Sequence, residues 1–457
     1  MGCYGRTALL SNVRANMILK NLFLKLFFWV AILQALVFPA FSAAQEPVEI
    51  FTLEQTIDTA IKVNLGLKLS KEETAAAVAA KKAQRTQFFP TFSASYEYDR
   101  VDASASVGGI ELVPEEEYAF VTSFSQPIFT GFSLLRRYDI AGLGLDTAKV
   151  KEQLRRQDII LDAKNAYFQL LQAQKLYEIA IQTVVQISSQ KEVADNFYQV
   201  GMSPLNDLLQ AQVELANAKQ ELIVAKNNMN NAESNFNTLL RRPIDTPVNI
   251  KDILDYAPFE ETLDYCFSEA EEKRLEIKNV DLEIEIAGKT LQLAKKDYYP
   301  SIDLKGSYFR YGTEWDVNGG SGIYDPSGWS IAAVAKWNFW EWGRTSYGVE
   351  EKRSRLSQAE LRKKEIVDNI RLEVKNAYLR TQQAEQAIIT IEKAIEQAKE
   401  NYRINQERYK EQVATQTDVL IAQTLLTRTM TNYYNALYAF KISKATLYRA
   451  IGQEVVE

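Results

Sequence analysis

The sequence predicts an α+β fold built as a tandem repeat, in which pairs of short strands are followed by long coiled-coil helices. A repeat is evident because KNAYFQLLQAQ, which begins at Lys164, recurs as KNAYLRTQQAE from Lys375. Strands are indicated after Pro90 and Pro300, where apolar and polar residues alternate. Coiled-coil helices are indicated because a three-four apolar spacing follows each strand pair and no proline interrupts it.

Composition excludes several classes of function. The chain has 457 residues with no histidine, and its 53 basic and 59 acidic residues give a net charge of -6. The commonest general base and metal ligand is therefore missing, and no basic excess is available to bind nucleic acid. We expect no enzyme activity, no cofactor and no nucleic-acid partner. Cys266 is expected to be a small apolar residue in a helix, in preference to a redox group.

The N-terminus has the sequence pattern of an export signal. Lys20 and Lys25 precede an apolar run, and Ser42-Ala43-Ala44 supplies small residues for cleavage. We assign residues 1–44 to a signal peptide, with Met17 as a possible true start. A membrane anchor is the weaker alternative, because the run is shorter than the roughly 20 residues that span a bilayer. No later segment is apolar enough for a membrane helix, so any passage through a membrane must use strands.

The remaining chain divides into two copies. The first repeat covers 45–243, a linker covers 244–260, and the second repeat covers 261–457. Each copy is predicted to run helix, two strands, very long helix, turn and helix. The first helix of each copy is expected to be continuous, over 53–88 and over 263–298, and to end before a proline.

Four segments are predicted to be membrane strands. They are 91–102, 116–129, 301–311 and 329–340. Glycine-rich segments around Val107 and Asn318 fit exposed loops. A soluble hairpin packed on a core would show the same alternation, but the export signal and an aromatic girdle favour the membrane. The girdle consists of Trp329, Trp337, Phe339 and Trp340.

Four strands cannot close a barrel, because the smallest membrane barrels need about eight. Several chains must pool their strands, and three chains would supply about twelve. The long helices, over 132–200 and 344–412, would each extend roughly 100 Å. The two shorter helices of each copy can stack end to end alongside the long one. A free-standing coiled-coil tether is the alternative, but it does not explain the strands.

These residues together resemble the TolC-type outer membrane efflux family over essentially the whole chain after the signal. The shared features are helices that end in FFP or YYP, strand pairs that close on IFTG and FWEWG, KNAY on the long helices, and the turn YQVGMSPLNDLLQAQ. The resemblance implies a homotrimer with a twelve-stranded transmembrane β-barrel in the outer membrane. A twelve-helix periplasmic α-barrel with coiled-coil hairpins would continue it.

The same resemblance implies a function and partners. The chain would be the passive exit duct of a tripartite efflux pump or a type I secretion system, exporting small molecules or polypeptides. Its partners would be a periplasmic adaptor, an inner-membrane RND or ABC transporter, and outer-membrane lipid. The alternative is a periplasm-spanning structural tether without transport.

The resemblance also implies a gate at the helix tips. Asp418 matches a ring acid at the constriction, Asp207 matches a latch residue, and Tyr409 matches the tyrosine of the closed-state network. The basic partner of the latch is replaced by Ala414, and a second ring acid by Ile421. Helix capping by the two aspartates and heptad packing by Tyr409 are the alternatives. The expected adaptor-docking residues are Gly201, Met202, Ser203, Pro204, Ala414 and Thr415.

Overall fold

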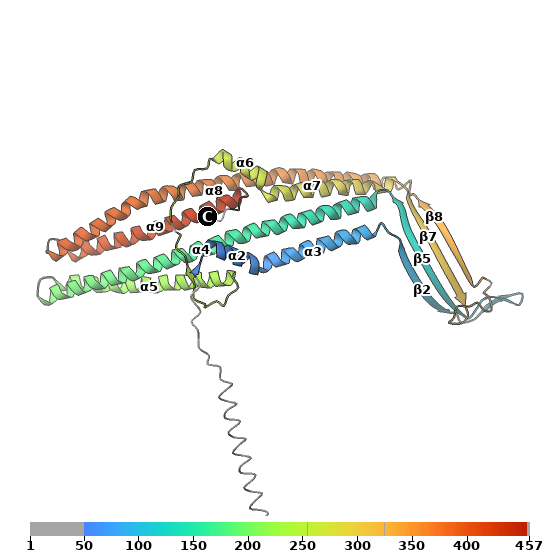
Figure 1. The fold of residues 1–457 in the computed structure, drawn as a ribbon, viewed down its shortest axis with the longest axis horizontal. Helices are drawn as coiled ribbons and strands as arrows, with labels where there is room; N and C mark the ends of the chain where they lie inside the picture. Colours follow the sequence, from blue (N-terminus) through green and yellow to red (C-terminus); the bar gives the residue numbers. More distant parts are fainter. Residues whose placement is uncertain (1–49, 254, 324, 455–457) are drawn as a thin grey trace, which may run out of the picture. The chain divides into compact units, whose positions relative to one another are not determined.

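The computed structural model describes residues 50–253, 255–323 and 325–454. The predicted signal peptide, with its possible start at Met17, lies outside the described residues. From Phe51 onward the chain forms one compact unit. Within it, a four-stranded sheet lies at one end of the long helices (Figure 1).

The elements follow in the same order twice. The first series is β1 (Ile50–Phe51), α2 (Leu53–Val63), α3 (Leu65–Thr86), β2 (Thr91–Arg100), β3 (Ala105–Val107), β4 (Ile110–Val113), β5 (Glu116–Thr130), α4 (Ser133–Gln199) and α5 (Leu205–Leu239). The second is β6 (Asn249–Ile250), α6 (Leu263–Lys273), α7 (Leu275–Ala294), the 3-10 helix η1 (Lys295–Tyr298), β7 (Ser301–Gly312), β8 (Ser327–Lys336), α8 (Arg344–Lys410) and α9 (Gln416–Ala450).

The prediction of one continuous first helix per copy is wrong in both copies. The backbone is extended at Asn64, with ψ 124°, and at Arg274, with ψ 120°. Asn64 starts α3 by accepting a hydrogen bond from Leu67 N at 3.1 Å. A side-chain cap of this kind lets a new helix begin without a proline or glycine. Arg274 makes no such cap and is held by an ion-pair cluster described below.

The long helices are confirmed within a residue or two of the predicted bounds. Each contains 67 residues, which corresponds to about 100 Å. In the first copy α3 and α5 both pack along α4, and in the second α7 and α9 pack along α8, as predicted from their lengths (Figure 1). Many of the predicted coiled-coil positions are buried, including Leu170, Ile187, Val374, Ile388 and Leu447. The apolar seam of each hairpin therefore follows the sequence pattern.

The sheet has the antiparallel order β2-β5-β7-β8. A register shift between Pro127 and Phe129 leaves Ile128 without a partner in β7, which is a β-bulge in β5. Pro127 has no N–H group to donate to the ladder, and proline within a sheet is commonly found at a bulge. The segment around Val107 is exposed, as predicted, and contains the short hairpin β3-β4.

The fourth strand ends earlier than predicted, so the assignment of 329–340 is wrong at its end. β8 stops at Lys336, which pairs with Ser301, and Trp337, Phe339 and Trp340 follow the strand. β7 begins at Ser301, directly after Pro300, so no residue of β7 remains to pair with Trp337.

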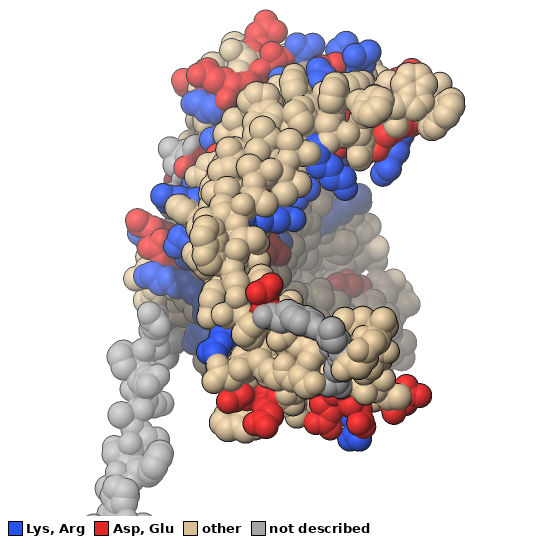
Figure 2. All heavy atoms as spheres, turned by 90° about the vertical axis from the view of Figure 1, so that its right-hand side faces the viewer, with Lys and Arg blue, Asp and Glu red and all other residues tan. Residues whose placement is uncertain are grey.

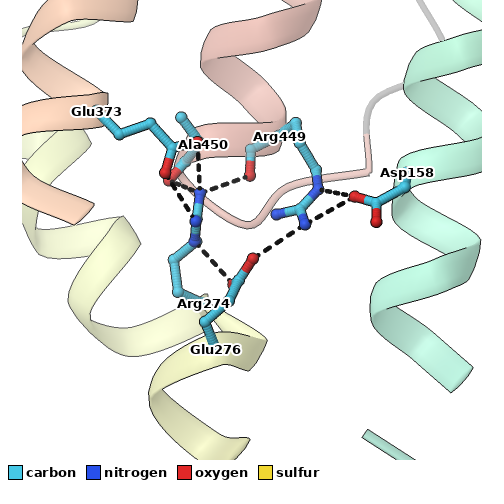
Figure 3. A network of polar contacts seen from close by, with 6 residues as sticks. All are labelled: Asp158, Arg274, Glu276, Glu373, Arg449 and Ala450. Atoms are coloured by element: carbon cyan, nitrogen blue, oxygen red, sulfur yellow. Dashed lines mark hydrogen bonds and ion pairs between the residues drawn. The ribbon is translucent and has the colours of Figure 1, made fainter. Parts of the chain in front are cut away.

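A cluster of two arginines and three acids fixes the break at Arg274 (Figure 3). The Arg274 guanidinium donates to both carboxylate oxygens of Glu373 on α8, at 3.2 and 2.9 Å, and to the Ala450 carbonyl oxygen at 3.1 Å. Its Nε lies 2.8 Å from Glu276 on α7. Arg449 joins that glutamate to Asp158 on α4, with both contacts at 2.9 Å. We call these five charged residues the arginine hub.

Removal of Arg274 is expected to destabilise the fold strongly. The Arg274 side chain is only 6% exposed, and Arg274→Ala removes the donor to the Ala450 carbonyl and the partner of Glu276 and Glu373. We expect a loss of about 3 kcal/mol in the free energy of unfolding. Arg371→Ala is the matched control, because Arg371 is 57% exposed and its pair with Glu271 should contribute under about 1 kcal/mol. Denaturant unfolding followed by circular dichroism measures both, and equal losses would contradict the prediction.

Candidate functional site

The sheet presents an apolar face that nothing in the described chain covers. The strand register places Phe92, Phe124, Leu304 and Ile331 on one face. Phe92 is 72% exposed and Ile331 63% exposed. The opposite face carries Ser93, Ser123, Ser307 and Ser330, which form two cross-strand hydroxyl pairs. A sheet with one apolar and one hydrated face fits a boundary between lipid and water.

The sheet also has two open edges. β2 and β8 are the end strands of its order, and each contains 10 residues. Unpaired edges of this length are templates for pairing with another chain.

The predicted girdle residues lie at both ends of the sheet. Trp329 is near the loop end of β8, opposite Tyr308. Trp337, Phe339 and Trp340 lie at the helix end, and all four side chains are more than half exposed. Trp329 and Trp337 are eight residues apart, about 26 Å along an extended chain, comparable to the roughly 25 Å apolar band of membrane barrels.

The tips of the two hairpins meet at Tyr409. Its side chain is 4% exposed, and its ring lies 5.5 Å from the Phe197 ring. The Tyr409 hydroxyl and Ser203 Oγ are both buried and make no hydrogen bond of good geometry to a described residue. Burial, and then the charge of Asp207, raise the pKa of Tyr409 above its ordinary value. The structure thus brings the predicted Tyr409 and Asp207 together.

The two predicted aspartates differ in their surroundings. Asp418 is exposed and forms a capping box, in which its carboxylate accepts from Thr415 N at 2.8 Å and Thr415 Oγ1 accepts from Asp418 N at 3.2 Å. The Thr415 hydrogen bonds lower the pKa of Asp418. Asp207 is half-buried and makes no capping hydrogen bond, and burial raises its pKa. Helix capping, one of the alternatives from sequence, therefore applies to Asp418 alone.

The expected docking residues lie at the two tips. Gly201 has a left-handed backbone with φ 75°, and Pro204 precedes the first turn of α5. Apolar side chains at the tips are exposed: Val200 is 66% exposed, Met202 54% and Val413 66%. Ala414 and Thr415 complete the second tip, which has an apolar surface of the same kind.

Between the tips and the middle of the long helices, hydrogen bonds between uncharged side chains join the two hairpins, and five of those among the described residues are considered together. We call this set the neutral seam. Its pairs are Gln172–Asn435 at 2.7 Å, Thr183–Thr427 at 3.1 Å, Gln186–Gln423 at 2.6 Å, Gln190–Tyr402 at 3.3 Å and Gln210–Thr417 at 2.8 Å. Each hairpin is held internally by an apolar seam. Apolar contacts also join the two hairpins, because Leu170 and Phe236 of the first share a core with Ile388 and Phe440 of the second.

Sequence reasoning missed the neutral seam and the buried Gln416. Gln416 is fully buried, and neither its amide nitrogen nor its carbonyl oxygen has a hydrogen-bond partner among the described residues. Glutamine at every fourth position, as in Gln186 and Gln190, was the available signal. It resembles the hydrated face of a helix, so it is not specific.

Cys266 behaves as expected for a structural residue. Its side chain is fully buried beside Ala270, Val374 and Leu447. Burial raises the pKa of the thiol to about 11, which disfavours the reactive thiolate. Among the described residues, no helix combines the length and apolarity that a bilayer span requires.

Comparisons with known proteins identify the family. The family model for outer membrane efflux protein matches residues 56–240 and 266–453. The outer membrane protein TolC of Vibrio cholerae serotype O1 is 23% identical over 330 residues, which cover 68% of this chain and 73% of that protein.

Solved structures share the fold. The outer membrane channel CmeC of Campylobacter jejuni matches with a TM-score of 0.77 and 18% identity, over 88% of this chain and 85% of that one. The open state of the Neisseria gonorrhoeae channel MtrE matches with a TM-score of 0.73 and 19% identity, over 88% of this chain and 89% of that one. The fold is that of a TolC-like outer membrane channel, and the chain belongs to the outer membrane efflux protein family, whose location is the outer membrane.

Proposed function

We propose that this protein is the passive exit duct of a tripartite efflux pump or a type I secretion system. Three copies pair β8 with β2 of the next copy, which closes a twelve-stranded barrel in the outer membrane. Their helices form a twelve-helix barrel in the periplasm. The tip residues contact a periplasmic adaptor, and an RND or ABC transporter in the inner membrane supplies the energy.

One observation carries this proposal, namely the four-stranded sheet with two open edges and an uncovered apolar face. In a bilayer, each unpaired backbone group costs several kcal/mol, so the edges must find partners. The helices support the same assembly. Apolar residues remain exposed on α5, such as Val213 and Ile223, and on α8, such as Leu361 and Leu372, where neighbouring copies can cover them.

The division of the chain remains part of the proposal. We assign residues 1–44 to a removed signal, 45–243 and 261–457 to two copies of one structural unit, and 244–260 to the linker. The helices of the two copies support this division, since α4 and α8 have the same length, as do α5 and α9.

We place the gate at the tips, where the Tyr409 ring of the second hairpin packs against Phe197 of the first and lies near Asp207. The neutral seam separates when the second hairpin moves, and the arginine hub acts as the fixed end. Three copies of Asp418 around the axis attract cations.

Planar-bilayer conductance of the purified protein tests the duct. We expect ion conduction with a preference for cations. Asp418→Asn should lower that preference, because it removes the charge while retaining an oxygen that can accept from Thr415 N. Glu407→Gln, on the exposed face of α8, is the matched control. Absence of conduction would favour the tether, and equal selectivity in all three proteins would remove Asp418 from the gate.

A further inference from the structure

Both turns from the sheet into a long helix hold a bulky aromatic residue in the left-handed backbone conformation. Phe132 has φ 66° and Trp342 has φ 53°. Glycine or asparagine is the usual residue at such positions, because a bulky side chain there strains the backbone. The two rings are nevertheless 50% and 85% exposed. Core packing therefore does not explain the retained strain.

The turn at Phe132 is fixed in place by its neighbours. The Phe132 ring lies edge-on to Phe129, at 5.3 Å, and to Tyr299, at 5.6 Å. A Cβ atom at Gly131 would clash with the Lys296 carbonyl oxygen, so this turn packs closely against η1. The strained aromatic residue is thus presented by a rigid junction of β5, α4 and η1.

Cations surround both turns. Lys295 and Lys296 belong to η1, and Arg136 and Arg137 lie near the start of α4. Arg344 begins α8 with a side chain that is 83% exposed. The neighbouring acids are Asp139, Asp297 and Glu341, so five cations face three anions. Asp and Glu instead gather at the loop end of the sheet, toward the bottom of Figure 2. Glu115, Glu116 and Glu117 lie in that region.

We propose that these two turns bind the headgroups of anionic phospholipids at the membrane surface on the helix side of the sheet. The inference rests on the proposed function, because it requires the sheet to cross the bilayer. The exposed rings occupy the interface, where aromatic side chains are favoured, and the excess lysine and arginine charge attracts the lipid phosphates. Charge complementarity selects anionic over zwitterionic lipid.

Lipid binding to the whole purified protein in neutral detergent tests the proposal. Native mass spectrometry follows titrations with dioleoyl phosphatidylglycerol and with dioleoyl phosphatidylcholine. We expect a clear preference for phosphatidylglycerol. The double variant Lys295→Gln/Lys296→Gln should weaken its binding roughly tenfold, because it removes two cations beside the Phe132 turn, one of which already pairs with Asp297.

The control variant Lys219→Gln/Lys226→Gln removes the same charge from exposed positions of α5, far along the chain from the turns. It should bind phosphatidylglycerol as the wild type does. Equal binding of the two lipids by the wild type, or an equal loss in the control, overturns the proposal. Because this measurement is made in detergent, it is independent of conduction. Normal bilayer conductance with no lipid preference would overturn the lipid site alone, whereas a lipid preference without conductance would overturn the duct alone.

Discussion

Ala333→Pro is expected to abolish the trimer while leaving the fold of the single chain intact. In β7 and β8, Tyr311 N donates to Pro326 O, and the register pairs Tyr308 with Trp329. Antiparallel ladders alternate between hydrogen-bonded and non-hydrogen-bonded pairs. The N–H of Ala333 therefore points away from β7 and toward the open edge.

Proline at an edge strand is tolerated when the missing N–H faces outward, so the pairing of β8 with β7 should survive. In the proposed barrel, however, the same N–H pairs with β2 of the next copy. Its loss leaves a carbonyl oxygen unpaired in hydrocarbon at each of three interfaces, at a cost of a few kcal/mol each.

Ala333→Val is the matched control, because it keeps the N–H and adds only apolar volume on the apolar face. Size-exclusion chromatography with light scattering in detergent measures the assembly. We expect single chains for the proline variant and trimers for the valine variant. A proline variant that remains trimeric and conducts normally would show that β8 does not close the barrel.

The regular elements could be predicted because their periods are long and uninterrupted. The 3.5-residue spacing through Val374, Ile388 and Tyr409 fixes α8 and its buried side, and the alternation after Pro90 fixes β2. Such a pattern can be recognised within one segment of the sequence, because the spacing of its apolar residues shows which face of the element is buried.

The breaks and ends could not be predicted because they depend on distant partners. The helical period continues through Arg274, and only the contacts with Glu373 and Ala450 stabilise an extended backbone there. In the same way, β8 ends at Lys336 because its partner strand begins after Pro300. Neither the break at Arg274 nor the end of β8 is indicated by the sequence of the element that ends there.

The candidate site likewise has residues that the sequence predicts and contacts that it does not. The resemblance placed Asp207 and Tyr409 at the tips, and they lie together. Five pairs of neutral residues across the neutral seam remained hidden, since each partner taken alone resembles a solvent-exposed Gln or Thr. Only tertiary packing shows that Gln423 is 1% exposed and paired with Gln186.

A disulfide across the neutral seam is expected to hold the duct closed. Thr183 Oγ1 and Thr427 Oγ1 are 3.1 Å apart, so cysteines at these positions have sulfur atoms close enough to bond. The native Cys266 should not compete, because its thiol is buried with a raised pKa. If opening requires the second hairpin to leave the first, the oxidised Thr183→Cys/Thr427→Cys variant cannot populate the open state.

The same variant supplies its own comparison, because dithiothreitol breaks the bond without changing the sequence. We expect the oxidised protein to conduct at least about tenfold less than the reduced protein in planar bilayers, since the bond removes the open population. Thr183→Cys alone should conduct equally before and after reduction. The neutral seam carries no charge, so the ratio of the oxidised to the reduced conductance should change little between low and high salt. For a gate held by ion pairs, that ratio would depend on salt. Equal conductance of the oxidised and reduced double variant would mean that the seam stays joined in the open duct, and that the tips open by another movement.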